Sequence, residues 1–298
     1  MHVTNKIIIN ADDFGYSDAV NGAILKCFQK WLVTSTSLLV NMPGFQGAVE
    51  MAHAHPIFSG KIGVRLNLTE GFSLTSGIRD CTSFCHVSGF FILKESSRLL
   101  VLNKREKQAV YEEMRTQLET ALLAGIHPSH LDIHHSLHRQ WPIATALASL
   151  AREYGIPRVR FSRSMGPEMR GVRGHYRRLF NRLVARLPGI CGPDLSGCVC
   201  DWLKLPEKRR PAGKYIEIAV HPILDEYGDL IDKDGKDLQR KLRPVIDHRH
   251  TISYTDLPVR TEKRDRSLGD TIRDWSLPAL PGEGLPSNGA QSEEVFGG

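Results

Sequence analysis

Acidic and imidazole side chains stand at three places in this sequence where an apolar run ends. The first is the pair Asp12 and Asp13, directly after the β-branched run 6–10. Adjacent residues at a strand end point in different directions. One carboxylate can therefore bind a metal ion while the other acts as a base on a bound water. Taken alone, such a pair is more often a turn or a helix cap.

The second place is residues 130–138, where an aspartate and four histidines stand close together. In a strand, Asp132 and His134 share a face. Imidazole and carboxylate ligands together suit Zn²⁺ and similar divalent ions. A polar turn with solvent-exposed histidines is the alternative, and we favour the metal site.

The third place is His221, at the end of the apolar run 215–220. A lone histidine at a strand end is usually structural. Beside the other two clusters it becomes a candidate general acid, because imidazole can donate a proton near neutral pH.

The elements that must position these residues are strands alternating with helices. This order predicts a parallel α/β architecture, and the polar clusters fall at the carboxyl ends of the strands, where a (β/α) barrel places its active site. The predicted strands cover residues 6–10, 36–40, 61–68, 130–134, 159–161 and 215–221, and the predicted helices cover residues 19–28, 47–53, 105–124 and 142–154.

Composition sets the wider limits. The chain has 298 residues, of which 41% are hydrophobic and 24% charged, as in ordinary globular domains. We predict one domain over residues 1–260 and a disordered tail over 261–298, of which residues 276–298 are rich in Pro, Gly, Ser and Glu. The sequence has no signal-peptide pattern and no run long enough to span a membrane. We therefore expect a soluble, cytoplasmic protein with reduced thiols and no membrane partner, and a homodimer as its possible assembly.

The net charge of +6 raises the question of nucleic-acid binding. Residues 158–186 hold nine arginines against the single acid Glu168. No aromatic interleaving or nucleic-acid motif accompanies them. We interpret the segment as a solvated helix face or an edge that recognises something anionic, and we expect no nucleic-acid partner.

Five segments together are similar to YdjC-like carbohydrate deacetylases. The matching blocks stand in the family's order across roughly residues 6–250: 10–15 with 21–24, then 34–40, 63–71, 132–138 and 217–222. The resemblance implies a distorted TIM-type (β/α) barrel and hydrolysis of an N-acetyl group from an amino sugar or an N-acetylglucosamine oligosaccharide. It also implies a divalent metal, Mg²⁺ or Zn²⁺, held by one aspartate and two histidines.

Carried over by position, the resemblance gives each residue a role. Asp13 would be a metal ligand and Asp12 the base. His134 would be the second ligand, with His138 as a weaker candidate, and His221 would lie near the leaving amine.

The block 63–71 departs from the family at the third ligand. Arg65 stands where the family has histidine, and a guanidinium stays protonated without a lone pair for a metal. Ser136 also replaces a histidine, and Ile223 a glycine. The remaining candidates are substrate-binding residues: Asn67, Glu70 and His138.

Three functions stay open on this basis. The first is a metal-dependent deacetylase acting on a small-molecule or oligosaccharide substrate. The second is a catalytically impaired sugar-binding homologue in which Arg65 takes the metal's place and pairs with Asp13. The third, less favoured, is a glycosidase using Asp12 and Asp132, against which the histidine-rich segment argues.

Overall fold

A computed structural model describes the chain apart from residues 1–4, 94–100, 167–168, 170, 206–209 and 260–298. The predicted tail over 261–298 therefore lies outside the described residues. No helix in the described part of the chain is both long and apolar enough to cross a membrane.

Six parallel strands form the main sheet and curl into a half-barrel. Their spatial order is β4-β3-β2-β1-β6-β5, so β1 lies near the middle between β2 and β6. Ile8 and Ile9 of β1 are buried, as the β-branched run predicts. The strands are β1 (Lys6–Phe14), β2 (Ser35–Leu38), β3 (Ile62–Leu66), β4 (Leu131–Ile133), β5 (Leu195–Cys198) and β6 (Tyr215–Val220).

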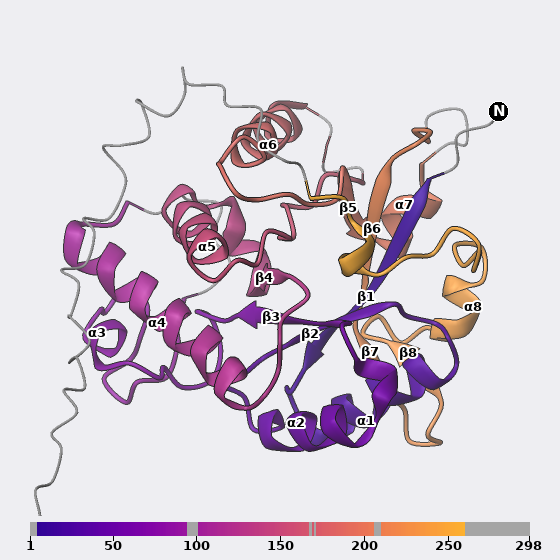
Figure 1. Ribbon diagram of the computed structural model, residues 1–298, viewed down its shortest axis with the longest axis horizontal. Coiled ribbons are helices and arrows are strands. Elements are labelled where there is room, and N and C mark those ends of the chain that lie inside the picture. Colours follow the sequence, from indigo (N-terminus) through magenta and orange to yellow (C-terminus); the bar gives the residue numbers. More distant parts are fainter. Residues whose placement is uncertain (1–4, 94–100, 167–168, 170, 206–209, 260–298) are drawn as a thin grey trace, which may run out of the picture. The chain divides into compact units, whose positions relative to one another are not determined.

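Helices cover the strands, with α4 and α5 on the β3–β4 side and α1 beside β1 (Figure 1). Ser17 begins α1 by accepting a hydrogen bond from the Val20 amide, and Asn103 and Glu106 form a capping box at the start of α4. The helices are α1 (Asp18–Gln29), α2 (Phe45–Ala54), α3 (Ser76–Arg79), α4 (Lys104–Leu123), α5 (Trp141–Glu153), α6 (Gly171–Val184), α7 (Val199–Leu203) and α8 (Leu238–Leu242).

Smaller elements complete the described chain. An antiparallel hairpin of β7 (Pro222–Leu224) and β8 (Leu230–Asp232) follows β6 directly. The short 3-10 helices are Pro56–Phe58, His134–Arg139 and Tyr254–Asp256.

The predicted parallel α/β, barrel-like fold is confirmed, with local differences. The strand that the sequence extends through His134 ends at Ile133, and a 3-10 helix follows. The predicted strand 159–161 makes a single bridge, from Val159 to Leu131. Both α6 and β5 are absent from the sequence prediction, because α6 is highly polar and β5 contains a serine and a glycine.

Candidate functional site

The carboxyl ends of the strands bring the predicted residues into one cleft. Asp12, Asp13, His134 and His221 all line a pocket of about 210 Å³. The same four residues also line an adjoining pocket of about 170 Å³. Parallel strands explain this convergence, since β1, β4 and β6 all end at the same edge of the sheet.

Asp12 is held in a buried ion-pair network. Its two carboxylate oxygens accept hydrogen bonds from Arg160, at 2.7 and 2.9 Å, and Oδ1 also accepts one from Asn10. Arg65 Nη1 forms a further ion pair with Asp12 Oδ2. Burial raises the pKa of Asp12, but Arg160, Arg65 and His221 outweigh it and hold that pKa well below its usual range. Asp12 is therefore ionised and a weak base.

Arg65 lies at the centre of the same network. The residue is 6% exposed, and Nη1 donates to Asp132 Oδ2 at 3.0 Å while Nε lies 3.4 Å from Asp13 Oδ1. Burial works against its charge, but the carboxylates of Asp12, Asp132 and Asp13 raise the pKa of Arg65 above its ordinary value. The register pairs Arg65 with Asp132 across β3 and β4.

Arg160 connects the second half of the network. It is 7% exposed and ion-pairs with Asp12, Asp132 and Glu217 at 2.6–2.7 Å. Burial raises the pKa of both Glu217 and Asp132, and this effect outweighs the opposite effect of the Arg160 charge. Four carboxylates, counting Asp13, thus face two guanidinium groups in the described site.

Asp13 has an unusual backbone and an unsatisfied oxygen. Its φ is +73°, in the left-handed region that costs a non-glycine residue of order 1–3 kcal/mol. Oδ1 is buried without a hydrogen-bond partner among the described residues. His134 Nε2 lies 3.7 Å from that oxygen. A strained backbone that points a carboxylate toward an imidazole is typical of a functional site rather than of a turn.

His134 is oriented by the loop after β3. Its Nδ1 lies 2.8 Å from Thr69 Oγ1 and 3.2 Å from Asn67 Oδ1. Asn67 is fully buried and also bonds to Asn41 and to the Glu70 backbone, so its side chain positions this loop. These contacts leave His134 Nε2 to face the cleft.

The other predicted residues have different surroundings. Glu70 Oε1 lies 2.8 Å from Nε2 of His135, and both line the smaller pocket. Nε2 of His221 lies 3.6 Å from Asp12 Oδ2 and 4.0 Å from Asp13 Oδ2. The backbone N–H of His221 donates a hydrogen bond to Asp232 Oδ1. The side chain of His138 lies outside what the structure describes.

The ligand set implied by the resemblance does not fit a divalent metal in this chain. Arg65 puts a buried, protonated guanidinium beside Asp12 and Asp13, where the set needs a neutral nitrogen with a lone pair. A separate group, Glu70, His134 and His135, offers a carboxylate and two imidazoles with ligand atoms within 4.8 Å of one another. That group could hold a metal by its donor chemistry.

Sequence reasoning missed Arg160 and Glu217 as members of the site. Arg160 was grouped with the solvated arginines of 158–186, and that interpretation is wrong for it. A signal was present for Glu217, which stands as a single charge in the apolar run 215–220, but not for Arg160, which has Arg158 and Arg163 close by. A charge in such a run needs a buried partner.

We expect stability to fall in mild acid because His130 is buried in neutral form. Burial is the main cause that lowers the pKa of His130 well below its usual range, followed by the charge of Arg160. The unfolded imidazole titrates near roughly 6.5, so below that pH the unfolded state binds a proton that the native state does not. Unfolding should become easier by up to about 1.4 kcal/mol for each pH unit below that value.

Urea unfolding at pH 7.5, 6.5 and 5.5 measures this slope. His130→Asn should reduce the slope without abolishing it, because burial also lowers the pKa of His134, whereas His175→Asn, at an exposed position of α6, should leave it unchanged. An unchanged slope in His130→Asn would show that other groups cause the acid sensitivity.

The chain is similar in sequence to one protein family and to several curated proteins. The family model described as "YdjC-like protein" matches residues 6–251. A carbohydrate deacetylase of Vibrio parahaemolyticus is 32% identical over 262 residues, covering 84% of this chain and 94% of that protein. A carbohydrate deacetylase of Halalkalibacterium halodurans is 36% identical over 152 residues, where the match spans 51% of this chain and only 62% of that protein's length.

A solved structure is also similar. The crystal structure of an Enterococcus faecalis V583 protein, proposed to cleave cellobiose phosphate, aligns with a TM-score of 0.56 and 26% identity. The alignment covers 75% of this chain and 83% of that one.

Proposed function

The chain belongs to the YdjC-like family, and on that premise we propose that it binds N-acetylated amino sugars and hydrolyses their acetamide group. One observation carries the proposal: Asp12, Asp13, His134 and His221 line a single pocket at the carboxyl edge of the sheet. The deacetylase names of the two relatives support the same reaction.

Asp13 is better suited than Asp12 to take the proton of the attacking water. Asp12 is saturated by Arg160 and Arg65, whereas the described residues give the Asp13 carboxylate only longer ion pairs, the shortest at 3.4 Å to Arg65. In this mechanism water adds to the acetamide carbonyl and gives its proton to Asp13. His221 then gives a proton to the amine nitrogen as the C–N bond breaks, which releases acetate and the free amino sugar.

Zinc is a better match than magnesium for the group of described residues whose donors suit a metal. Two imidazoles and a carboxylate, from His134, His135 and Glu70, are ligands that Zn²⁺ prefers, whereas Mg²⁺ prefers oxygen ligands.

A cytoplasmic location and a homodimer stay predictions from the sequence. The glycosidase reading loses support, because Asp12 and Asp132 are both tied to Arg160.

A second candidate function is sugar binding with little or no turnover. The position of Arg65 favours it, because a fixed guanidinium among three carboxylates replaces the ligand that the family's chemistry uses. Acetate release from a di-N-acetylated glucosamine dimer, measured beside binding of the same dimer by calorimetry, separates the two candidates. Binding without release supports the second, and the absence of both contradicts the proposal as a whole.

We expect His221→Asn to lower acetate release about 100-fold, since general acid catalysis contributes at least roughly that factor. The side chain of His221 makes only ion pairs of 3.6 and 4.0 Å in the described structure, so the melting temperature should change little. His86→Asn, at an exposed position, is the matched control. Equal rates in both variants would remove His221 from the reaction.

A further inference from the structure

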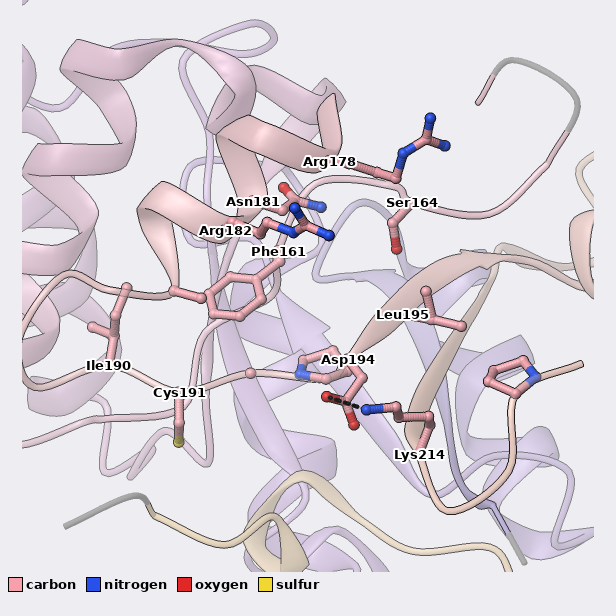
Figure 2. A pocket seen from close by; sticks show the side chains of 14 residues that line it. Phe161, Ser164, Arg178, Asn181, Arg182, Ile190, Cys191, Asp194, Leu195 and Lys214 are labelled. Carbon is pink, nitrogen blue, oxygen red and sulfur yellow. Dashed lines mark ion pairs between the residues drawn. The ribbon is translucent and has the colours of Figure 1, made fainter. Parts of the chain in front are cut away.

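The arginine-rich segment borders a second, larger pocket, of about 420 Å³. Figure 2 shows Arg178, Asn181 and Arg182 projecting from α6 on one side, with Asp194 and Lys214 on the other. Positions 178, 181 and 182, together with Ala185, share one face of the helix, because they are spaced three and four residues apart. The sequence of α6 therefore directs its polar residues to this pocket.

The charges at the rim leave the pocket positive. Lys214 is paired with Asp194 at 3.8 Å, and Arg178 donates to the Met169 carbonyl, which carries no charge. Among the residues that the structure describes, no acidic side chain pairs with Arg178 or Arg182. Two guanidinium groups at one rim thus have no acidic partner within the described part of the chain.

The walls between these charges are apolar. Phe161, Ile190 and Leu195 line the pocket together with two prolines. Asn181 donates from Nδ2 to the Ser162 carbonyl at 2.7 Å, while its Oδ1 is buried without a partner in the described part of the chain. An unsatisfied polar atom beside apolar walls is typical of a ligand pocket rather than of packed core.

We propose that this pocket binds a small organic anion, a phosphate or carboxylate carried on an apolar ring-sized body. Arg182 and Arg178 bind the anionic group, and Phe161, Ile190 and Leu195 contact the apolar body. A guanidinium recognises planar or tetrahedral oxyanions with paired N–H donors.

The pocket is separate from the candidate catalytic cleft. Phe161 lines both, but the arginines of the cleft, Arg65, Arg160 and Arg163, do not line this pocket. The proposal therefore does not depend on the deacetylase reaction. It also gives the charged segment a specific role, in place of a purely solvated helix face.

Calorimetric titration of the full chain with 1-naphthyl phosphate and with 1-naphthoate tests the proposal and distinguishes the two anions. Inorganic phosphate lacks the apolar body and 1-naphthol lacks the charge, so both should bind at least about tenfold more weakly than the better naphthyl anion. Arg182→Gln should weaken binding of that anion about tenfold, as expected for loss of one charge-assisted contact. Arg186→Gln, an exposed position that does not line the pocket, should bind as the wild type does.

Three results would overturn the proposal: equal binding of 1-naphthol, equal effects of the two arginine substitutions, or no binding of either anion by the wild type. Melting curves of both variants show whether the fold is intact. If Arg182→Gln is unstable, Arg178→Gln serves in its place, because it removes the other guanidinium group at the same rim.

Discussion

Replacing Arg65 by histidine should create a metal site between Asp13 and His134. The variant removes a guanidinium that lies 3.4 Å from Asp13 Oδ1, and it offers an imidazole lone pair on the same strand. Repulsion between unit charges about 4 Å apart is about 4 kcal/mol at an effective dielectric near 20, and a divalent ion feels more. We therefore expect Zn²⁺ to bind at least about 100-fold more tightly to Arg65→His.

Two further variants sharpen this test. Arg65→Gln removes the charge without supplying an imidazole, so it should bind Zn²⁺ less tightly than Arg65→His. Glu70→Gln, combined with Arg65→His, removes the carboxylate of the neighbouring group and shows whether that group contributes. Tight binding and full activity in the wild type would mean that other residues complete the site.

Replacing Arg160 should have the largest effect on stability. Its guanidinium ion-pairs with Asp12, Asp132 and Glu217, all of which are buried. Removing one partner of a buried ion pair typically costs about 3–5 kcal/mol, because the remaining charges are left without compensation. We expect Arg160→Met to lose at least that much free energy of unfolding, measured by urea denaturation at pH 7.5.

Arg160→Lys is the matched control for this measurement. It keeps a positive charge but cannot reach three carboxylates with a planar fork. Its loss should be smaller than that of Arg160→Met. Equal stability of Arg160→Met and the wild type would show that the network contributes little to the fold.

The fold and the outline of the site could be predicted because their signals are local. The apolar run before Asp12 marks β1, and alternation of strands with helices gives the parallel architecture. Since parallel strands end at one edge, Asp12, Asp13, His134 and His221 had to converge if the fold was right. The segments that resemble YdjC-like deacetylases indicated which histidines to consider as site residues.

The ion-pair network could not be predicted from the same signals. Arg160 and Glu217 lie 57 positions apart, and only the closing of the sheet brings them within 2.6 Å. Asp12 was expected to be the base, but its basicity depends on two guanidinium groups that reach it from elsewhere in the chain. Asn67 stays a candidate for substrate contact, but its contacts with His134 and Asn41, which support the imidazole, could not be predicted from the sequence.

The most direct test of the account is the location of zinc in crystals of the wild type and of Arg65→His, soaked with Zn²⁺ and measured at the zinc absorption edge. The account predicts an anomalous peak between Asp13 and His134 in Arg65→His. In the wild type it predicts no peak there, because the guanidinium of Arg65 contacts Asp12, Asp13 and Asp132. Any zinc in the wild type should be bound by Glu70, His134 and His135. A peak between Asp13 and His134 in the wild type, with Arg65 displaced from the carboxylates, would contradict it.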